Sequence, residues 1–135
     1  KDFVIKAKGK QYAIEIKSVE ALKGNVNMSI LQGKTAVIEK DSYALSVLTR
    51  PENEQSVDAE YFIKTAQFVP NIGFQIGDTI DNWYHGLNNL DTQKEVKVTL
   101  EEKTESLYIS RNIWRNGVSF DQFIVILNKF FSINE

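Results

Sequence analysis

Residues 2–17, with the sequence DFVIKAKGKQYAIEIK, decide the fold that the sequence predicts. Apolar and polar side chains alternate on both sides of Gly9-Lys10, which is typical of two half-buried strands joined by a two-residue turn. Glycine at the first central position suits a type II′ turn. The stretch therefore predicts a β-hairpin in which Lys8 faces Gln11.

This register determines which side chains of the hairpin share a face. It sets Asp2 opposite Lys17 and Val4 opposite Glu15, and cross-strand partners project to the same side of a sheet. Asp2, Glu15 and Lys17 are then expected on one face, with the two acids as diagonal neighbours about 7–8 Å apart at the backbone. Two carboxylates supply the hard oxygen ligands that Mg²⁺ prefers. The hairpin therefore predicts a Mg²⁺ site at Asp2 and Glu15, in which Mn²⁺ can substitute, with Lys17 beside it.

The segment after the hairpin predicts a helix and then an interior strand. We expect the helix at residues 28–40, with Asn27 as its cap. Residues 43–49 are apolar at both parities, as in a strand buried on both faces. A strand, a helix and an interior strand in this order predict a crossover to a parallel neighbour. The buried stripe of the helix is expected to consist of Ile30, Leu31, Val37 and Ile38.

The remainder of the chain predicts an α+β extension of the same domain. The expected elements are a helix from Ser56 to Pro70, a helix at residues 78–90, a hairpin of residues 94–101 and 105–110, and a last helix that starts at the capping box of Ser119 and Gln122. The predicted fold is therefore α/β, a single domain over residues 1–135. Its mixed sheet and motif core lie within residues 1–49, and the extension within residues 50–135.

Composition limits the classes of function. The chain has 135 residues and no cysteine, which excludes disulfides and thiolate zinc sites. Its net charge is −2, yet residues 1–50 carry nine Lys/Arg against five Asp/Glu, and residues 51–135 carry seven against thirteen. The basic first part suits a polyanionic partner, although uneven surface charge without function is the competing interpretation. No apolar run is long enough to cross a membrane, so the sequence predicts no membrane span. A cytoplasmic location is expected.

The hairpin residues also resemble a known signature. Asp2, twelve intervening residues and then Glu15-Ile16-Lys17 are similar to the motif of the PD-(D/E)xK, restriction-endonuclease-like nuclease superfamily. In that family the aspartate opens one strand of a hairpin, E-x-K lies on the next strand, and a helix and an interior strand follow. The resemblance covers residues 2–49 and implies Mg²⁺-dependent hydrolysis of DNA, less readily of RNA, with Asp2, Glu15 and Lys17 as catalytic residues. The family core normally begins with a helix and a strand before the aspartate, so the chain is expected to be a piece of a longer bacterial or phage protein.

Four further residues are candidates for contact with nucleic acid. By resemblance, Gln32 and Lys34 on the helix after the motif would lie near the metal or a phosphate. In residues 111–117, RNIWRNG, Arg111 and Arg115 flank an apolar pair and could stack on bases and pair with phosphates. The competing interpretation is that the apolar pair anchors in the core and the arginines extend into solvent.

The last helix has an apolar face that belongs to the core or forms a homodimer contact. A functional alternative also remains open. In it, the chain is a non-catalytic nucleic-acid-binding or protein-binding module whose hairpin carboxylates hold no metal.

Overall fold

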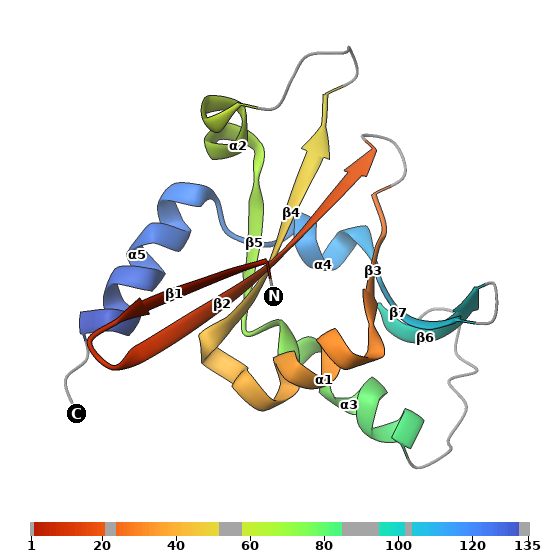
Figure 1. Cartoon of the computed structure of the whole chain (residues 1–135). Coiled ribbons are helices and arrows are strands. Elements are labelled where there is room, and N and C mark those ends of the chain that lie inside the picture. The colour runs from red at the N-terminus through yellow and green to blue at the C-terminus, as the bar shows by residue number, and fades with distance from the viewer. Residues whose placement is uncertain (1, 21–23, 52–57, 85–94, 102–103, 133–135) are drawn as a thin grey trace.

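The computed structural model describes residues 2–20, 24–51, 58–84, 95–101 and 104–132 (Figure 1). These residues form a mixed α/β structure. The strands are β1 (Phe3–Ala7), β2 (Lys10–Glu20), β3 (Val26–Ser29), β4 (Tyr43–Arg50), β5 (Gln67–Pro70), β6 (Val96–Glu101) and β7 (Thr104–Ile109). The α-helices are α1 (Ile30–Glu39), α2 (Ala59–Thr65), α3 (Ile72–Tyr84), α4 (Arg111–Arg115) and α5 (Phe120–Ser132), and a 3₁₀ turn at Lys40–Ser42 joins α1 to β4.

The strands form two sheets. The larger sheet has the order β1-β2-β4-β5, in which β2 and β4 are parallel and the other neighbours are antiparallel. The smaller sheet has the order β3-β7-β6 and is antiparallel throughout. The mixed sheet, the parallel neighbour and the second hairpin were all predicted. β4 is buried over its first six residues, as expected of an interior strand.

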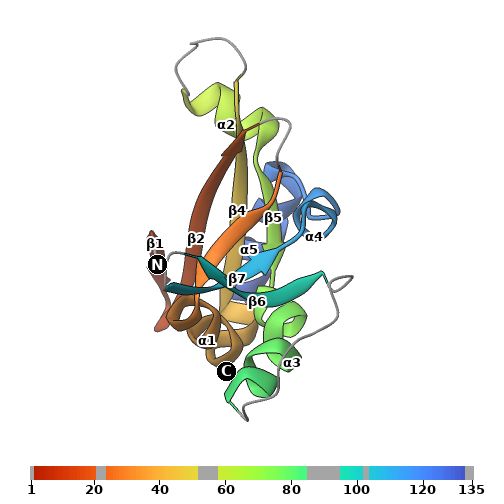
Figure 2. The same cartoon turned by 90° about the vertical axis from the view of Figure 1, so that its right-hand side faces the viewer.

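Helices and the small sheet cover the two faces of the large sheet. Figure 2 shows α1 and the small sheet on one side and α5 on the other. The α1 side is packed with aliphatic and aromatic side chains from both sheets, among them Ala13, Val19, Met28, Leu45, Val47, Ile76, Leu107 and Trp114. The α5 side is rich in aromatic rings, among them Tyr12, Phe68 and Phe123, with Phe68 and Phe123 stacked at a centroid distance of 4.2 Å. None of the described helices is long and apolar enough to cross a membrane.

The hairpin turn differs from the predicted one. Lys8 and Gly9 both have positive φ, 52° and 75°, as in a type I′ turn. Phe3 therefore pairs with Ile14, two residues before the partner that the predicted register assigns. Because side chains alternate with a period of two, a shift of two residues leaves every side chain on its expected face. The predicted turn was wrong, but the predicted assignment of the hairpin side chains to the two faces of the sheet is unchanged.

α1 starts later than predicted, because its cap is Ser29 rather than Asn27. The Ser29 Oγ accepts from the Gln32 N–H at 3.0 Å, and the Gln32 Oε1 accepts from the Ser29 N–H at 2.9 Å, which completes a capping box. Met28 consequently belongs to β3 and is buried at 1% exposure.

The predicted buried stripe of α1 is also partly wrong. Leu31 and Ile38 are exposed at 72% and 69%, whereas Gly33 and Ala36 are buried. Leu107 of β7 explains this choice, because a Cβ at Gly33 would collide with its side chain. The small residues therefore face the core, and they allow the small sheet to approach α1 closely.

The middle of the chain departs most from the prediction. The helix expected from Ser56 to Pro70 ends at Thr65, and residues 67–70 form β5. Phe68 explains the change, because it pairs with β4 on one side and exchanges two backbone hydrogen bonds with Val118 on the other, at 2.8 and 2.7 Å. α3 begins at Ile72 rather than residue 78, and its predicted end near residue 90 lies outside the described residues. The last helix and its Ser119–Gln122 capping box are confirmed.

Candidate metal centre

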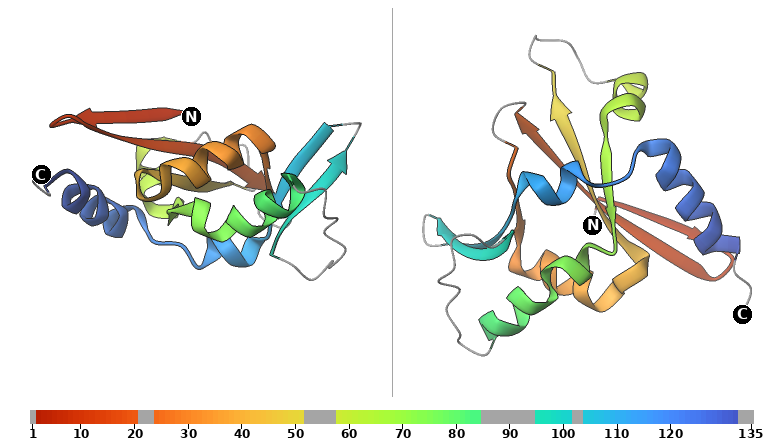
Figure 3. Two further views of the ribbon diagram at one scale, coloured as in Figure 1. Left: turned by 90° about the horizontal axis from the view of Figure 1, so that it is seen from below. Right: turned by 180° about the vertical axis from the view of Figure 1, so that it is seen from behind.

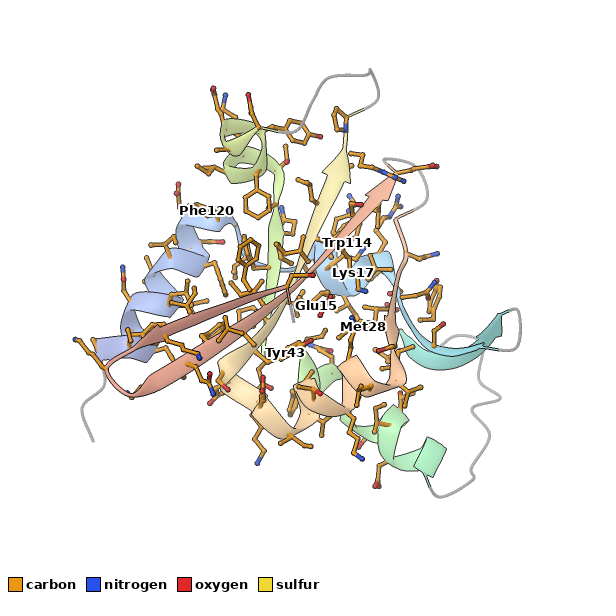
Figure 4. The ribbon with its side chains drawn as sticks, viewed as in Figure 1. Glu15, Lys17, Met28, Tyr43, Trp114 and Phe120 are labelled. Atoms are coloured by element: carbon orange, nitrogen blue, oxygen red, sulfur yellow. The ribbon has the colours of Figure 1, made fainter. Side chains whose placement is uncertain are left out.

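Glu15 is the most buried acid of the predicted site. It lies on β2, between β1 and β4, and its side chain is only 4% exposed. The Tyr43 hydroxyl donates to its Oε1 at 3.5 Å, and the Lys17 Nζ lies 3.8 Å from its Oε2. Figure 4 shows these three side chains near the centre of the molecule, above α1 in that view. A buried carboxylate is costly unless neighbouring groups compensate it, and Tyr43 and Lys17 are two of the groups beside Glu15.

Asp2 lies beside Glu15, at the start of the edge strand. Its N–H donates to the Ile14 carbonyl at 3.1 Å, and its Oδ2 accepts from the Ile16 N–H at 2.7 Å. The ladder ends at the Phe3–Ile14 pair, so the predicted pairing of Asp2 with Lys17 is not observed, and the carboxyl groups of Asp2 and Glu15 lie within hydrogen-bonding reach of each other. Asp2 itself is exposed.

The pKa of Asp2 reflects this environment. The Ile16 N–H lowers it most, partial desolvation raises it, and a hydrogen bond with Glu15 and the charge of Lys17 lower it further. Asp2 is therefore held as a carboxylate within reach of the Glu15 carboxyl group. The structure thus brings together Asp2, Glu15 and Lys17.

Lys17 is oriented from α1. Its Nζ donates to the Gln32 Oε1 at 3.2 Å, and the same oxygen accepts from the Ser29 N–H. The capping box that starts α1 thus fixes the amide that holds Lys17. Gln32, a predicted nucleic-acid contact, is brought into the cluster as a partner of Lys17. The Lys17 side chain remains 27% exposed, so its ammonium is accessible from solvent.

The other predicted nucleic-acid contacts lie elsewhere. Lys34 is exposed on α1. Arg111 and Arg115 are exposed on the short helix α4, where a turn had been expected. Between them Trp114 is 6% exposed, and its indole N–H donates to the Gly24 carbonyl. For Trp114 the core-anchor interpretation of this segment is therefore confirmed.

Tyr43 is a member of the cluster that the sequence did not indicate. It is fully buried at the first position of β4, next to Glu15. Burial raises the pKa of its hydroxyl, and the nearby charges of Glu15 and Glu39 raise it further, so this group is a hydrogen-bond donor at neutral pH. The sequence feature that could have indicated this role is the hydroxyl of Tyr43, because a tyrosine buried in an interior strand needs a hydrogen-bond partner for its hydroxyl.

The donor set fits Mg²⁺ better than a metal that needs a complete protein cage. Among the described residues, no group of three or more His, Asp or Glu side chains is placed to hold a metal ion. Mg²⁺ keeps several waters and is commonly bound through one or two carboxylates, which is what Asp2 and Glu15 offer.

Comparisons of the chain with protein-family models, with curated proteins and with solved structures find no match. Its function must therefore be argued from its own residues.

Proposed function

We propose that the chain carries the catalytic core of a Mg²⁺-dependent deoxyribonuclease of restriction-endonuclease-like type. The observation that carries the proposal is the convergence of Asp2 and Glu15 beside Lys17, with the Glu15 carboxylate buried. The order of elements supports it in part: the hairpin is followed by β3 of the small sheet, then by α1 and by β4, which is parallel to the E-x-K strand.

Each residue has a role that its position allows. Asp2 and Glu15 would hold the ion, with Glu15 kept in place by the Tyr43 hydroxyl. When bound, Mg²⁺ polarises a phosphate oxygen and lowers the pKa of a coordinated water. Lys17, oriented by Gln32 and partly exposed, would donate to the attacking water or to the phosphate oxygen on which charge develops.

Cleavage of supercoiled plasmid DNA in Mg²⁺ tests the proposal. We expect the wild-type chain to nick the plasmid and EDTA to stop it. Lys17→Met should lower the rate by about 10²–10³-fold, the usual effect of removing one donor to the developing charge. Lys64→Met is the matched control, because Lys64 is an exposed lysine on α2 that pairs with Glu60 at 2.9 Å. Circular dichroism checks that both variants are folded.

Two results would contradict the proposal. One is cleavage by Lys17→Met and Asp2→Ala at the wild-type rate, which would place the activity elsewhere. The other is a folded wild-type chain that cuts no DNA in Mg²⁺ or Mn²⁺, which would favour a non-catalytic interaction module.

A further inference from the structure

The tip of the β1–β2 hairpin carries lysines that the proposed chemistry does not use. Lys6 and Lys8 are exposed, and residues 6–11 line a shallow concavity of about 440 Å³. Within the described part of the chain, neither ammonium takes part in an ion pair or a hydrogen bond. Two cations thus remain available at one end of the hairpin.

Lys10 has a different task, which is to brace the tip. Its Nζ donates to the Phe130 carbonyl of α5 at 3.2 Å and lies 5.7 Å from the centre of the Phe130 ring. The last carbonyls of a helix attract cations, which adds to this contact. Figure 3 shows the end of the hairpin beside the C-terminal end of α5. The tip is therefore anchored to the body of the protein and can present Lys6 and Lys8 at a fixed place.

Lys8 occupies a backbone position that lysine disfavours. Its φ of 52° lies in the left-handed region, where Asn, Asp and Gly are preferred at this position of a type I′ turn. Turn propensity therefore does not explain a lysine at this position. Residues in sparsely populated conformations concentrate at functional sites.

Geometry connects the tip with the metal centre. Val4 and Lys6 lie on the same face of β1, and Val4 pairs with Ala13, two residues before Glu15 on β2, so Lys6 shares the face of Glu15. A hollow lined by Val4 and Ala13 lies on that face, and the acidic Glu39 at the end of α1 borders it. Because Glu39 would repel a polyanion, we expect the polyanion to run along the outer edge of β1, the edge strand of the sheet. Asp2 and Lys8 are six positions apart in the sequence, which corresponds to about 20 Å along an extended chain. At roughly 3.4 Å per base pair this distance equals about six base pairs of duplex DNA.

We propose that Lys6 and Lys8 at the hairpin tip bind the phosphate backbone of duplex DNA about six base pairs from the phosphate that occupies the metal centre. The proposal rests on the proposed nuclease function and names the surface that holds its substrate. The competing explanation is that lysines on an exposed edge strand only prevent strand-to-strand aggregation.

The salt dependence of DNA binding separates the two explanations. Binding of a random-sequence duplex is measured in EDTA at several NaCl concentrations, for the wild type and for Lys6→Gln/Lys8→Gln. Losing two phosphate contacts should reduce the slope of log K against log salt by about 1.8 and weaken binding about 30-fold at about 0.15 M salt. Lys6→Arg/Lys8→Arg keeps both charges and should keep the wild-type slope. Lys64→Gln removes an exposed lysine of α2 and should leave the slope unchanged.

The outcomes distinguish this proposal from the nuclease proposal. If the wild type cuts and binds DNA but Lys6→Gln/Lys8→Gln keeps the wild-type slope, the tip proposal alone fails. If that variant aggregates while its soluble fraction binds with an unchanged slope, the lysines protect an edge and the tip proposal is wrong. If the wild type neither cuts nor binds DNA, both proposals fail. A reduced slope in a folded variant supports the tip proposal.

Discussion

If the proposed Mg²⁺ centre is correct, neutralising Glu15 should remove most of the thermal stabilisation expected from the ion. A ligand that binds only the native state stabilises it by about 2.7 kcal/mol when its free concentration is about 100 times Kd. For a chain of 135 residues each kcal/mol moves Tm by roughly 3–5 °C, so the wild type should gain about 10 °C. Glu15→Gln keeps the volume and an acceptor for the Tyr43 hydroxyl, but it removes one of two ligand charges.

The magnitude for the variant follows from the same relation. If its affinity for Mg²⁺ falls about 100-fold, the same concentration stabilises it by only about 0.4 kcal/mol, or roughly 1–2 °C. Without metal, Glu15→Gln loses the 3.8 Å contact with Lys17 but keeps a group that can donate to the Asp2 carboxylate, and Lys17 keeps its partner Gln32, so stability should change by less than about 1 kcal/mol.

Calorimetric melts with and without Mg²⁺ or Mn²⁺ measure both effects. Glu60→Gln is the matched control, because Glu60 is an exposed glutamate paired with Lys64 on α2. It should keep the full wild-type rise. A Glu15→Gln protein that gains as much as the wild type, or a wild type that gains nothing, would refute the assignment of this centre.

Three further predictions concern stability. Tyr43→Phe removes the donor to a buried carboxylate and should lower the free energy of unfolding in urea by about 1–3 kcal/mol, and an unchanged midpoint would show that the 3.5 Å contact contributes nothing. Lys8→Asn suits the positive φ better and should raise the free energy of unfolding by up to about 1 kcal/mol. A melt that shows no gain in stability would contradict this. Because the pKa of Asp2 is lowered from 3.8 in the folded state, its carboxylate stabilises the fold above that pH and loses the effect as pH falls through the lowered value. The Tm of the wild type should therefore differ from that of Asp2→Asn at pH 7, and this difference should disappear below about pH 4. A difference that stays constant with pH would contradict this linkage.

The grouping of Glu15 and Lys17 on one face was predictable because parity decides which side chains share a face. Glu15 and Lys17 are two residues apart on one strand, and the error in the turn was an even shift. The turn itself was not predictable from local rules, since they favour glycine at the first turn position and disfavour a lysine with positive φ at Lys8.

The misassigned elements depend on partners that are distant in sequence. Gly33 faces the core because Leu107 of β7, more than seventy residues later in the sequence, packs against it. Phe68 belongs to a strand because β4 and Val118 flank it, although its own segment continues a helical pattern. Tyr43 was missed for the same reason, because its role depends on the position of Glu15 across the sheet.

Asp2 and Glu15 belong to parts of the large sheet that differ in local stability. Glu15 lies on a strand that is paired on both sides, next to the buried β4, whereas Asp2 precedes β1, whose outer edge is open. Edge strands and terminal segments open at low free energy, and core strands open only near global unfolding. A cation bound by both Asp2 and Glu15 would therefore tie the N-terminal end of β1, which opens at low free energy, to β2, which is paired on both sides. Amide hydrogen exchange along β1 should slow when the ion binds, while exchange along β4 stays as it was.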